Sequence, residues 1–522
     1  MSNKNVNLVY IGLAVALGIL IGSLMNYEKS TLFGSFARNK EEAKIKQLID
    51  NIRYEYVDEV DTDSLLDKTI VQMLRNLDPH SVYIPQKEVN KVRETMNGQF
   101  IGIGIQFRMI RDTVTVIKAI KGGPSYKAGL QAGDRILMAD RDTLYGKQYN
   151  SDKIINFLKS NSPSKVDLQV YRKKTDELLD FSFKRGYVDI KSVPIYYMMD
   201  ETIGYIKVEL FSRTTYDEFH KALKTLKKQG LQTLILDLRN NTGGYMDIAN
   251  DMIDEFLTDG TLMVFTKSKS GQVFKNYATG KGDFETGGVY VLINEESASA
   301  SEIVAGAIQD NDRGLIVGRR SFGKGLVQQE MNLGDGSMVR LTTARYYTPT
   351  GRSIQKPYDH NGNKTYFHDG ESRIRSGELY NEDSIPRIDS LKYTTPRGKT
   401  VYGGGGIIPD IFVPLDTTMY FRLFHMKDIN AFVFDYVDER RTALDTLDFE
   451  TFDTDFDVDE PLNLYLEKYE MTTTHRALLT WYLKSLLARE IFDDDAFYKV
   501  YHRQDNVIQK ILTLEHQSPS SS

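Results

Sequence analysis

The feature that most constrains the fold of this chain is an alternation of apolar runs with amphipathic helical patterns between residues 188 and 415. Four short runs read as strands, at residues 203–208, 233–238, 289–293 and 315–317. The run at 233–238 is apolar throughout most of its length, which suits a strand buried on both faces. An amphipathic helix separates the first two runs, with apolar residues at Tyr216, Phe219, Leu223 and Leu226. This alternation predicts an α/β core.

A chain of 522 residues is too long to fold around one ordinary hydrophobic core, so two or more domains are expected. Their patterns divide the chain into an apolar N-terminal segment (1–26), a helical N-terminal region (27–97), a strand-rich unit (98–187), the α/β core (188–415) and a helical C-terminal extension with a disordered tail (416–522). Residues 371–406 are polar and rich in glycine and charge, which predicts a loop. The acidic stretch 450–460 is expected to be a linker.

The N-terminal segment contains eighteen residues without charge, Leu8 to Met25. That length lies at the lower edge of a membrane span and is long for the apolar part of a signal peptide. We therefore expect an uncleaved membrane anchor or, alternatively, a cleaved signal. Either places the rest of the chain in the cell envelope, on the periplasmic or extracytoplasmic side, or secretes it to that compartment.

Composition excludes several kinds of chemistry. The chain has no cysteine, which rules out disulfides, thiol catalysis and cysteine-ligated zinc. Its 66 basic and 72 acidic residues give a net charge of −6, and no dense basic run is present, so no nucleic-acid partner is expected. No metal or cofactor is expected. The eight histidines are scattered, and His80 reads as a turn residue.

A serine stands where the apolar run at 289–293 gives way to a helix. The helix is expected to begin near Ala300, which puts Ser299 beside a helix N-terminus, where free N–H groups can stabilise an oxyanion. The same residues also fit a capping box, in which Ser299 caps the helix and Glu302 reaches back. The spacing alone leaves both interpretations open.

A lysine follows the last of the four runs. Lys324 lies between Gly323 and Gly325, whose flexible backbone would let the side chain enter a crowded site, although a solvated loop lysine fits equally well. Ser321 and Lys324 also form an S-x-x-K pattern. That pattern needs a helix to bring its serine and lysine together, and the two glycines argue against one.

A glycine turn, Asp237-Leu238-Arg239-Asn240-Asn241-Thr242-Gly243-Gly244, follows the strand at 233–238. Glycines between a strand and a helix offer bare N–H groups to an anion. By itself this is a weak signal, because such turns are common in α/β proteins.

Taken together, these segments resemble the S41 family of carboxyl-terminal processing proteases over residues 77–414. The motifs occur in family order: L-D-P-H-S, G-I-G-I, A-G-L-x-x-G-D, L-R-N-N-x-G-G, S-A-S-A-S-E-I, F-G-K-G-x-V-Q, G-R-S-I-Q and I-I-P-D-I. The resemblance implies that Ser299 is the nucleophile, Lys324 its base and Gln328 the residue that orients the lysine. It further implies oxyanion donors at Ala300 and at Gly243 or Gly244, between which the sequence does not choose.

The strand-rich unit resembles a PDZ domain. Its residues Ile101, Gly102, Ile103, Gly104 and Ile105 match the carboxylate-binding loop and strand. PDZ domains add an extended peptide as a further strand and hold its C-terminal carboxylate. A purely structural role for this unit is the alternative.

The resemblance therefore implies a serine endopeptidase with a Ser–Lys dyad that selects proteins or peptides by their C-terminal tails. The alternative is a non-catalytic PDZ scaffold that keeps a protease-like fold. Expected partners are substrates with accessible C-termini and the membrane. The C-terminal helical region is a candidate for an adaptor site or for self-association.

Overall fold

The computed structural model describes residues 40–147, 149–358, 364–367, 369–417, 419–470 and 476–517. The segment Leu8 to Met25 and the C-terminal tail at 518–522 lie outside these residues. No helix within the described ranges combines the length and the apolar composition needed to cross a bilayer. The chain separates into two compact units, one up to Leu77 and one from Asp78 onwards.

The first unit is helical, as the sequence predicts. It contains α2 (Lys40–Glu55) and α3 (Thr62–Arg75). The carboxylate of Asp61 caps α3 by accepting the backbone N–H groups of Asp63 and Ser64 at 3.1 Å each. No residue of α2 is buried.

The strand-rich unit begins after helix α4 (Gln86–Asn97). Its main sheet has the order β3-β4-β5-β7-β8, with β6 paired to β5 and a separate pair of β2 with β9. The strands are β2 (Gln99–Gly102), β3 (Ile105–Ile110), β4 (Thr113–Ala119), β5 (Asp134–Ala139), β6 (Asp142–Thr143), β7 (Lys165–Arg172), β8 (Glu177–Lys184) and β9 (Gly186–Asp189), with helices α5 (Pro124–Ala128) and α6 (Ser151–Leu158). Among the described strands β3 pairs only with β4, so one of its edges is open.

The α/β core is built on a six-stranded sheet of order β10-β11-β12-β15-β16-β21. All neighbouring pairs are parallel except β10 with β11. The strands are β10 (Ile195–Met198), β11 (Ile203–Lys207), β12 (Thr233–Asp237), β15 (Gly288–Ile293), β16 (Leu315–Gly318) and β21 (Ile411–Phe412). Every residue of β11 and β12 is buried, because helices cover both faces of the sheet.

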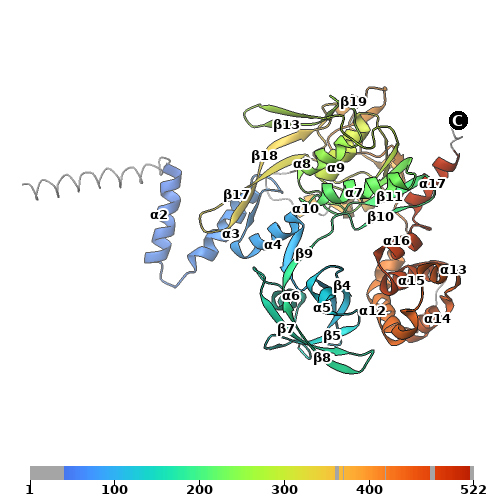
Figure 1. The fold of residues 1–522 in the computed structure, drawn as a ribbon. Helices are drawn as coiled ribbons and strands as arrows, with labels where there is room; N and C mark the ends of the chain where they lie inside the picture. Colours follow the sequence, from blue (N-terminus) through green and yellow to red (C-terminus); the bar gives the residue numbers. More distant parts are fainter. Residues whose placement is uncertain are drawn as a thin grey trace, which may run out of the picture. The chain divides into compact units, whose positions relative to one another are not determined.

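One face of this sheet packs on α7 (Thr215–Lys228), α8 (Met246–Asp254) and α9 (Ala300–Asp310), which form one apolar cluster with it (Figure 1). The opposite face is covered by the last helix of the chain, α17 (Asn506–Gln517). Val507, Ile508 and Ile511 of α17 pack against Tyr205 and Ile235 of the sheet and are fully or almost fully buried. The end of the C-terminal extension is therefore part of the core.

A second sheet stands beside the core and has the order β1-β18-β13-β14, with β17 paired to β18. Its strands are β1 (Val82–Ile84), β13 (Leu262–Ser268), β14 (Val273–Tyr277), β17 (Leu326–Asn332) and β18 (Met338–Tyr347). The antiparallel pair of β17 and β18 continues directly from the loop that bears Lys324.

Two predictions for the later part of the chain need correction. The expected linker at 450–460 is wrong, since α13 (Phe449–Asp455) and the start of α14 (Asp459–Lys468) occupy it and Phe452 is fully buried. Most acidic residues there are exposed, whereas the aromatic residues between them pack in a helical cluster. The expected loop at 371–406 is mainly irregular but contains α11 (Asp369–Arg375), two short 3-10 helices, β19 (Lys392–Thr394) and β20 (Thr400–Tyr402).

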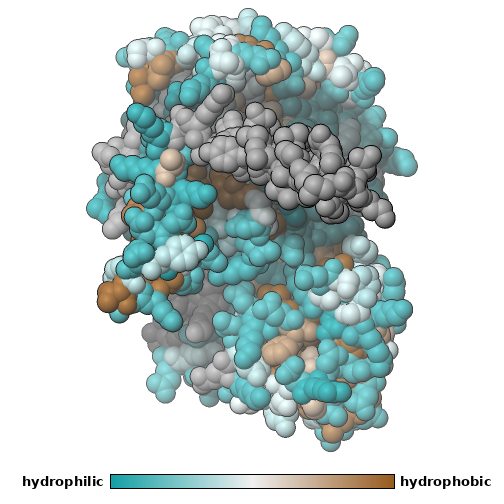
Figure 2. Space-filling model, turned by 90° about the vertical axis from the view of Figure 1, so that its left-hand side faces the viewer, coloured by the Kyte–Doolittle hydropathy of each residue, from teal (hydrophilic) through white to brown (hydrophobic). Residues whose placement is uncertain are grey.

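The extension is otherwise helical, as predicted, with α12 (Met419–Leu444), α15 (Arg476–Ile491) and α16 (Asp494–Tyr501) before α17. The predicted fold class, α/β with helical regions at both ends and a β-rich unit between them, is confirmed. On the face shown in Figure 2, hydrophilic residues predominate and hydrophobic ones form small, separate patches.

Candidate active site

Three loops meet at one edge of the six-stranded sheet. They follow the carboxyl ends of β12, β15 and β16, which are neighbouring parallel strands. Because parallel strands end at the same edge, segments far apart in the sequence come together there, where α/β proteins bind their ligands. A cavity of about 470 Å³ lies among them, and its lining includes Gly243, Gly244, Ser299, Lys324 and Gln328.

Ser299 has a backbone conformation that an ordinary helix cap does not have. Its φ and ψ are 56° and −113°, whereas capping residues normally lie in the extended region. A residue with a side chain adopts such angles only at a cost, and strain of this kind is concentrated at functional sites. A strained turn between strand and helix also exposes the nucleophile in α/β-hydrolases. The geometry therefore favours a chemical role for Ser299 over plain capping.

The neighbouring serines are engaged elsewhere. The hydroxyl of Ser297 donates to the carbonyl of Leu238 at 2.8 Å, and that of Ser301 donates to the carbonyl of Asn241 at 2.9 Å. Both side chains are fully buried, and neither lines the cavity. Of the three serines in S-A-S-A-S, Ser299 alone borders the cavity.

The S-x-x-K interpretation of Ser321 finds no support, because residues 319–325 form no helix. The Ser321 hydroxyl is fully buried, donates to the carboxylate of Glu302 and accepts the N–H of Ile407 at 2.7 Å.

The carboxylate of Glu302 joins the loop of Ser299 to the loop of Lys324. One oxygen accepts the N–H groups of Ser299 and Lys324 at 2.9 and 2.8 Å, and the other accepts the N–H of Gly323 at 2.7 Å and the hydroxyl of Ser321. Burial raises the pKa of Glu302, and these four donors oppose that shift. The capping box of Ser299 and Glu302 is thus present, but the same carboxylate also positions a second loop.

Tyr346, on β18, makes a second tie between the same two loops. Its hydroxyl lies 2.8 Å from the carbonyl oxygen of Lys324 and 3.2 Å from that of Ser299, so it can donate to both. The side chain is almost completely buried. No sequence pattern pointed to this residue, because tyrosine is common in strands and Tyr346 lies in none of the motifs.

Lys324 is largely enclosed. Burial lowers the pKa of its amine to about 8, the positive charge of Arg340 acts in the same direction, and the carboxylates of Glu302 and Asp78 oppose both. In the described part of the chain no hydrogen bond links this amine to Gln328. The amide nitrogen of Gln328 instead lies 3.5 Å from the hydroxyl of Thr342, which places Gln328 at the cavity without fixing the lysine.

The glycine turn lies directly against the serine. A Cβ built on Gly243 would be 2.7 Å from Cβ of Ser299 and 2.9 Å from the nitrogen of Ala300, so only glycine fits there. The N–H of Gly243 donates to the side chain of Asn241 at 2.8 Å. Within the described residues, the N–H groups of Gly244 and Ala300 have no acceptor. Of the two glycines the sequence left open, Gly244 therefore has the free donor.

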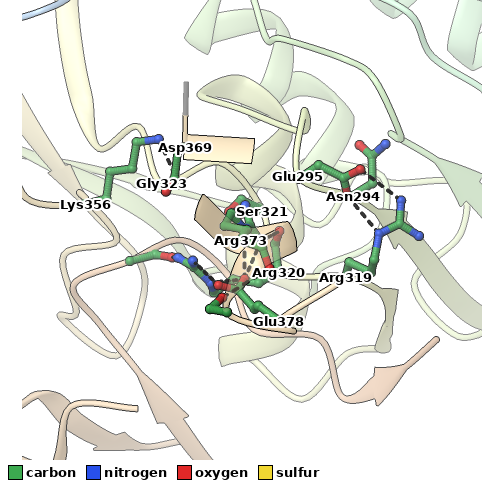
Figure 3. Close-up of polar contacts among 12 residues, drawn as sticks. Asn294, Glu295, Arg319, Arg320, Ser321, Gly323, Lys356, Asp369, Arg373 and Glu378 are labelled. Carbon is green, nitrogen blue, oxygen red and sulfur yellow. Dashed lines mark hydrogen bonds and ion pairs between the residues drawn. The ribbon is translucent and has the colours of Figure 1, made fainter. Parts of the chain in front are cut away.

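Buried ion pairs hold the residues that precede Lys324 in its loop (Figure 3). Arg320 binds both oxygens of Glu378 at 2.8 Å each, and Arg373 binds the same carboxylate. Arg373 also donates to the carbonyl oxygens of Arg320 and Ser321 at 2.6 and 3.3 Å. Arg373 and Glu378 come from the segment expected to be a loop, so that segment supports the site.

His80 lies in a turn, as predicted, with its N–H donating to the carboxylate of Asp78 at 2.8 Å. Its imidazole is 2.9 Å from the hydroxyl of Tyr366. Burial lowers the pKa of His80 to about 3, and the charge of Lys324 adds to this effect. The imidazole is therefore neutral near pH 7.

The loop expected to bind a carboxylate joins β2 to β3. Ile101 and Gly102 end β2, Ile103 is buried in the core of the strand-rich unit, and Ile105 begins the open-edged strand β3. Gly104 has a φ of 78°, which favours glycine.

One group of side chains in the described ranges has the spacing of a metal site, His220, Glu255 and Asp283. Lys227 and Lys224 lie 3.3 and 3.7 Å from the carboxylate of Asp283. These ammonium groups already neutralise it, so the group is better described as an ion-pair cluster.

Comparison with known proteins adds to this geometry. Residues 202–360 match the model of peptidase family S41, residues 102–182 match a PDZ domain, and residues 419–493 match a family of unknown function. A photosystem II D1 C-terminal processing protease of known structure is 25% identical, covers 70% of this chain and 86% of its own, and has a TM-score of 0.37.

Among curated relatives, the carboxy-terminal-processing protease of Bartonella bacilliformis is 35% identical over 321 residues, which are 60% of this chain and 73% of that protein. The carboxy-terminal processing proteases CtpB and CtpA of Bacillus subtilis are 32% and 33% identical, over 61% and 60% of this chain and 66% of each relative.

The hydroxyl of Tyr346 provides a test of how the two loops are held. In Tyr346→Phe two buried carbonyls lose a donor, which typically costs about 1–3 kcal/mol. We expect amide hydrogen exchange in residues 319–325 to become about tenfold faster, since local opening is governed by local stability. Tyr290→Phe is the matched control, because it removes a hydroxyl bound to Glu515, remote from the site. Equal exchange in wild type and Tyr346→Phe would contradict this role.

Proposed function

The chain belongs to peptidase family S41, the carboxy-terminal processing serine proteases, and we propose that Ser299 and Lys324 form its catalytic dyad. One observation carries the proposal. A strained serine at a helix N-terminus and a buried lysine with a lowered pKa line the same cavity. A serine hydroxyl needs a base, and a lysine serves when it is neutral.

In the proposed reaction, Oγ of Ser299 attacks the scissile carbonyl carbon of a peptide while its proton passes to Nζ of Lys324. The resulting oxyanion accepts the free N–H groups of Ala300 and Gly244, the former at the positive end of α9. The ammonium of Lys324 then gives its proton to the leaving amine. The neutral lysine then takes a proton from water, whose oxygen attacks the acyl carbon. The bond to Oγ of Ser299 breaks, and Lys324 returns the proton to Oγ.

The hydrogen bonds of Glu302 and Tyr346 support this dyad, in which the amine of Lys324 takes the place of a histidine base. They fix the backbone of both residues, so the dyad depends less on a side chain that orients the amine. Gln328 is at the cavity, and we propose that it contacts the amine once substrate is bound.

Ser299→Ala tests the nucleophile. We expect kcat on a peptide substrate to fall by about 10⁴-fold or more, as when other serine proteases lose their nucleophile. Ser301→Ala should cost much less, because its hydroxyl faces Asn241 and not the cavity. Thermal unfolding of both variants shows how much stability is lost because a serine at the start of α9 has been removed. A Ser299→Ala enzyme that still cleaves, beside an inactive Ser301→Ala enzyme, would overturn the assignment.

The pH profile tests the base. Lys324 is inactive as a base when protonated, so kcat/KM should be low at acidic pH and rise through an apparent pKa of about 8. Lys324→Arg should be inactive, because its guanidinium stays protonated. His80, with a pKa of about 3, cannot produce such a limb. If the residual activity of Lys324→Ala rose with pH through the same apparent pKa, Lys324 could not be the base.

We further propose that the PDZ unit selects substrates by their C-terminal tails. The open edge of β3 allows a peptide to add as a strand, and the loop before it is close to that edge. A tail bound there would deliver a neighbouring segment of the substrate to the cavity.

Gly104→Ala tests tail selection. The new Cβ would strain a φ of 78° and lie 3.2 Å from the side chain of Val188, which distorts the loop. We expect kcat/KM to fall for a protein with a free apolar C-terminus and to change little for the same protein with an amidated one. Gly146→Ala, also at positive φ but in open space, is the control. Equal losses on both substrates would mean that the unit is structural.

A further inference from the structure

A residue of the C-terminal extension binds Arg239, which belongs to the glycine turn that carries Gly244. Arg239 lies two residues beyond the end of β12, and its Nη1 donates to both carboxylate oxygens of Asp505, at 2.9 and 3.2 Å. Asp505 immediately precedes α17 and lies 266 positions after Arg239 in the sequence. A charged residue of the extension thus reaches the loop that carries Gly244.

The same guanidinium is bound on its other side by Asp237, whose carboxylate also accepts the hydroxyl of Tyr205 at 2.8 Å. Lys207 donates to the carbonyl of Arg239 at 3.2 Å. The Asp237 and Asp505 side chains are 1% and 6% exposed and that of Arg239 is 16% exposed. Two cations, Arg239 and Lys207, therefore lie beside the carboxylates of Asp237 and Asp505 with little access to water. Removal of one charge leaves the cluster unbalanced, which is costly in such surroundings.

Although burial alone would raise it, the guanidinium of Arg239 holds the pKa of Asp505 below its ordinary value. Asp505 is therefore charged at neutral pH, and the guanidinium of Arg239 binds one carboxylate on each side, Asp237 and Asp505.

From Arg239 the loop is connected rigidly to the proposed oxyanion hole. Asn240 exchanges hydrogen bonds with the side chain of Asn294, at 2.9 and 2.7 Å. The carbonyl of Asn241 accepts the N–H of Ala298 at 3.0 Å, and its side chain accepts the N–H of Gly243. Hydrogen bonds therefore hold the chain at Asn240, Asn241 and Gly243, between Arg239 and Gly244.

We propose that Asp505 is a positioning residue for catalysis, which fixes Arg239 and through it the N–H of Gly244 that binds the oxyanion. This inference rests on the proposed function of the site. The C-terminal extension would then contribute to the reaction through Asp505, in addition to the apolar packing of α17 on the sheet.

A second role of Asp505 must be separated from this one. Its Oδ1 also accepts the N–H groups of Val507 and Ile508, at 3.0 and 3.2 Å, and so caps α17. Asparagine caps helices about as well as aspartate does and has the same shape. Asp505→Asn therefore keeps the cap and removes the charge that holds Arg239.

In Asp505→Asn we expect kcat on a peptide substrate to fall about tenfold to a hundredfold, somewhat less than for loss of an oxyanion donor, with KM changed less than about twofold. The affinity for a peptide boronic acid, which forms a tetrahedral adduct with the serine, should fall by a similar factor. Arg239→Lys keeps a cation but cannot bind two carboxylates as a fork, so it should show the same pattern.

Asp493→Asn is the matched control, because Asp493 caps α16 in the same way and, within the described residues, makes no hydrogen bond or ion pair with the glycine turn at 237–244. It should leave kcat and the boronate affinity unchanged. Asp505→Asn and Arg239→Lys enzymes with wild-type kcat and boronate affinity would overturn the proposal, and so would a rise in KM alone. Cleavage by wild type and its loss in Ser299→Ala, measured on the same peptide, show separately whether the proposed function holds.

Discussion

The site depends on one buried carboxylate. Glu302 lies in the first turn of α9 and accepts four hydrogen bonds, from the backbone of Ser299, Gly323 and Lys324 and from the hydroxyl of Ser321. Backbone N–H groups have no freedom to follow a moving partner, so this arrangement fixes the two loops relative to each other. The strained backbone of Ser299 can persist only because its surroundings over-determine it in this way.

The rest of the molecule supports these loops from both sides. Three neighbouring parallel strands bring them to one edge, and β18 adds the hydroxyl of Tyr346. Arg373 and Glu378 hold the lysine loop by a buried ion network, while Asp505 holds the residue that starts the glycine loop. Each support is charged or polar and buried, where hydrogen bonds are strong and unpaired groups are costly. The geometry of the proposed site is therefore held by segments that are distant in sequence.

Sequence patterns predicted the α/β core and its strands well, because a strand buried on both faces has a nearly continuous apolar run. They failed at 450–460, where acidic residues suggested a linker although Phe452 is fully buried in a helical cluster. Composition averages over a helix and hides a single buried face. For the same reason the polar segment 371–406 gave no sign that Arg373 and Glu378 are buried against each other.

The sequence by itself determined which residue types the site contains: a serine before a helix, a lysine between glycines and a glycine turn after a strand. Local spacing is enough for this, because each motif lies within a few residues. Only the tertiary structure decided that Ser299, and not Ser297 or Ser301, borders the cavity and that burial lowers the pKa of Lys324. It also decided that Gly244, and not Gly243, has an N–H without an acceptor among the described residues. Exposure, free donors and desolvation are properties of the surroundings, which segments from different parts of the chain create together when it folds.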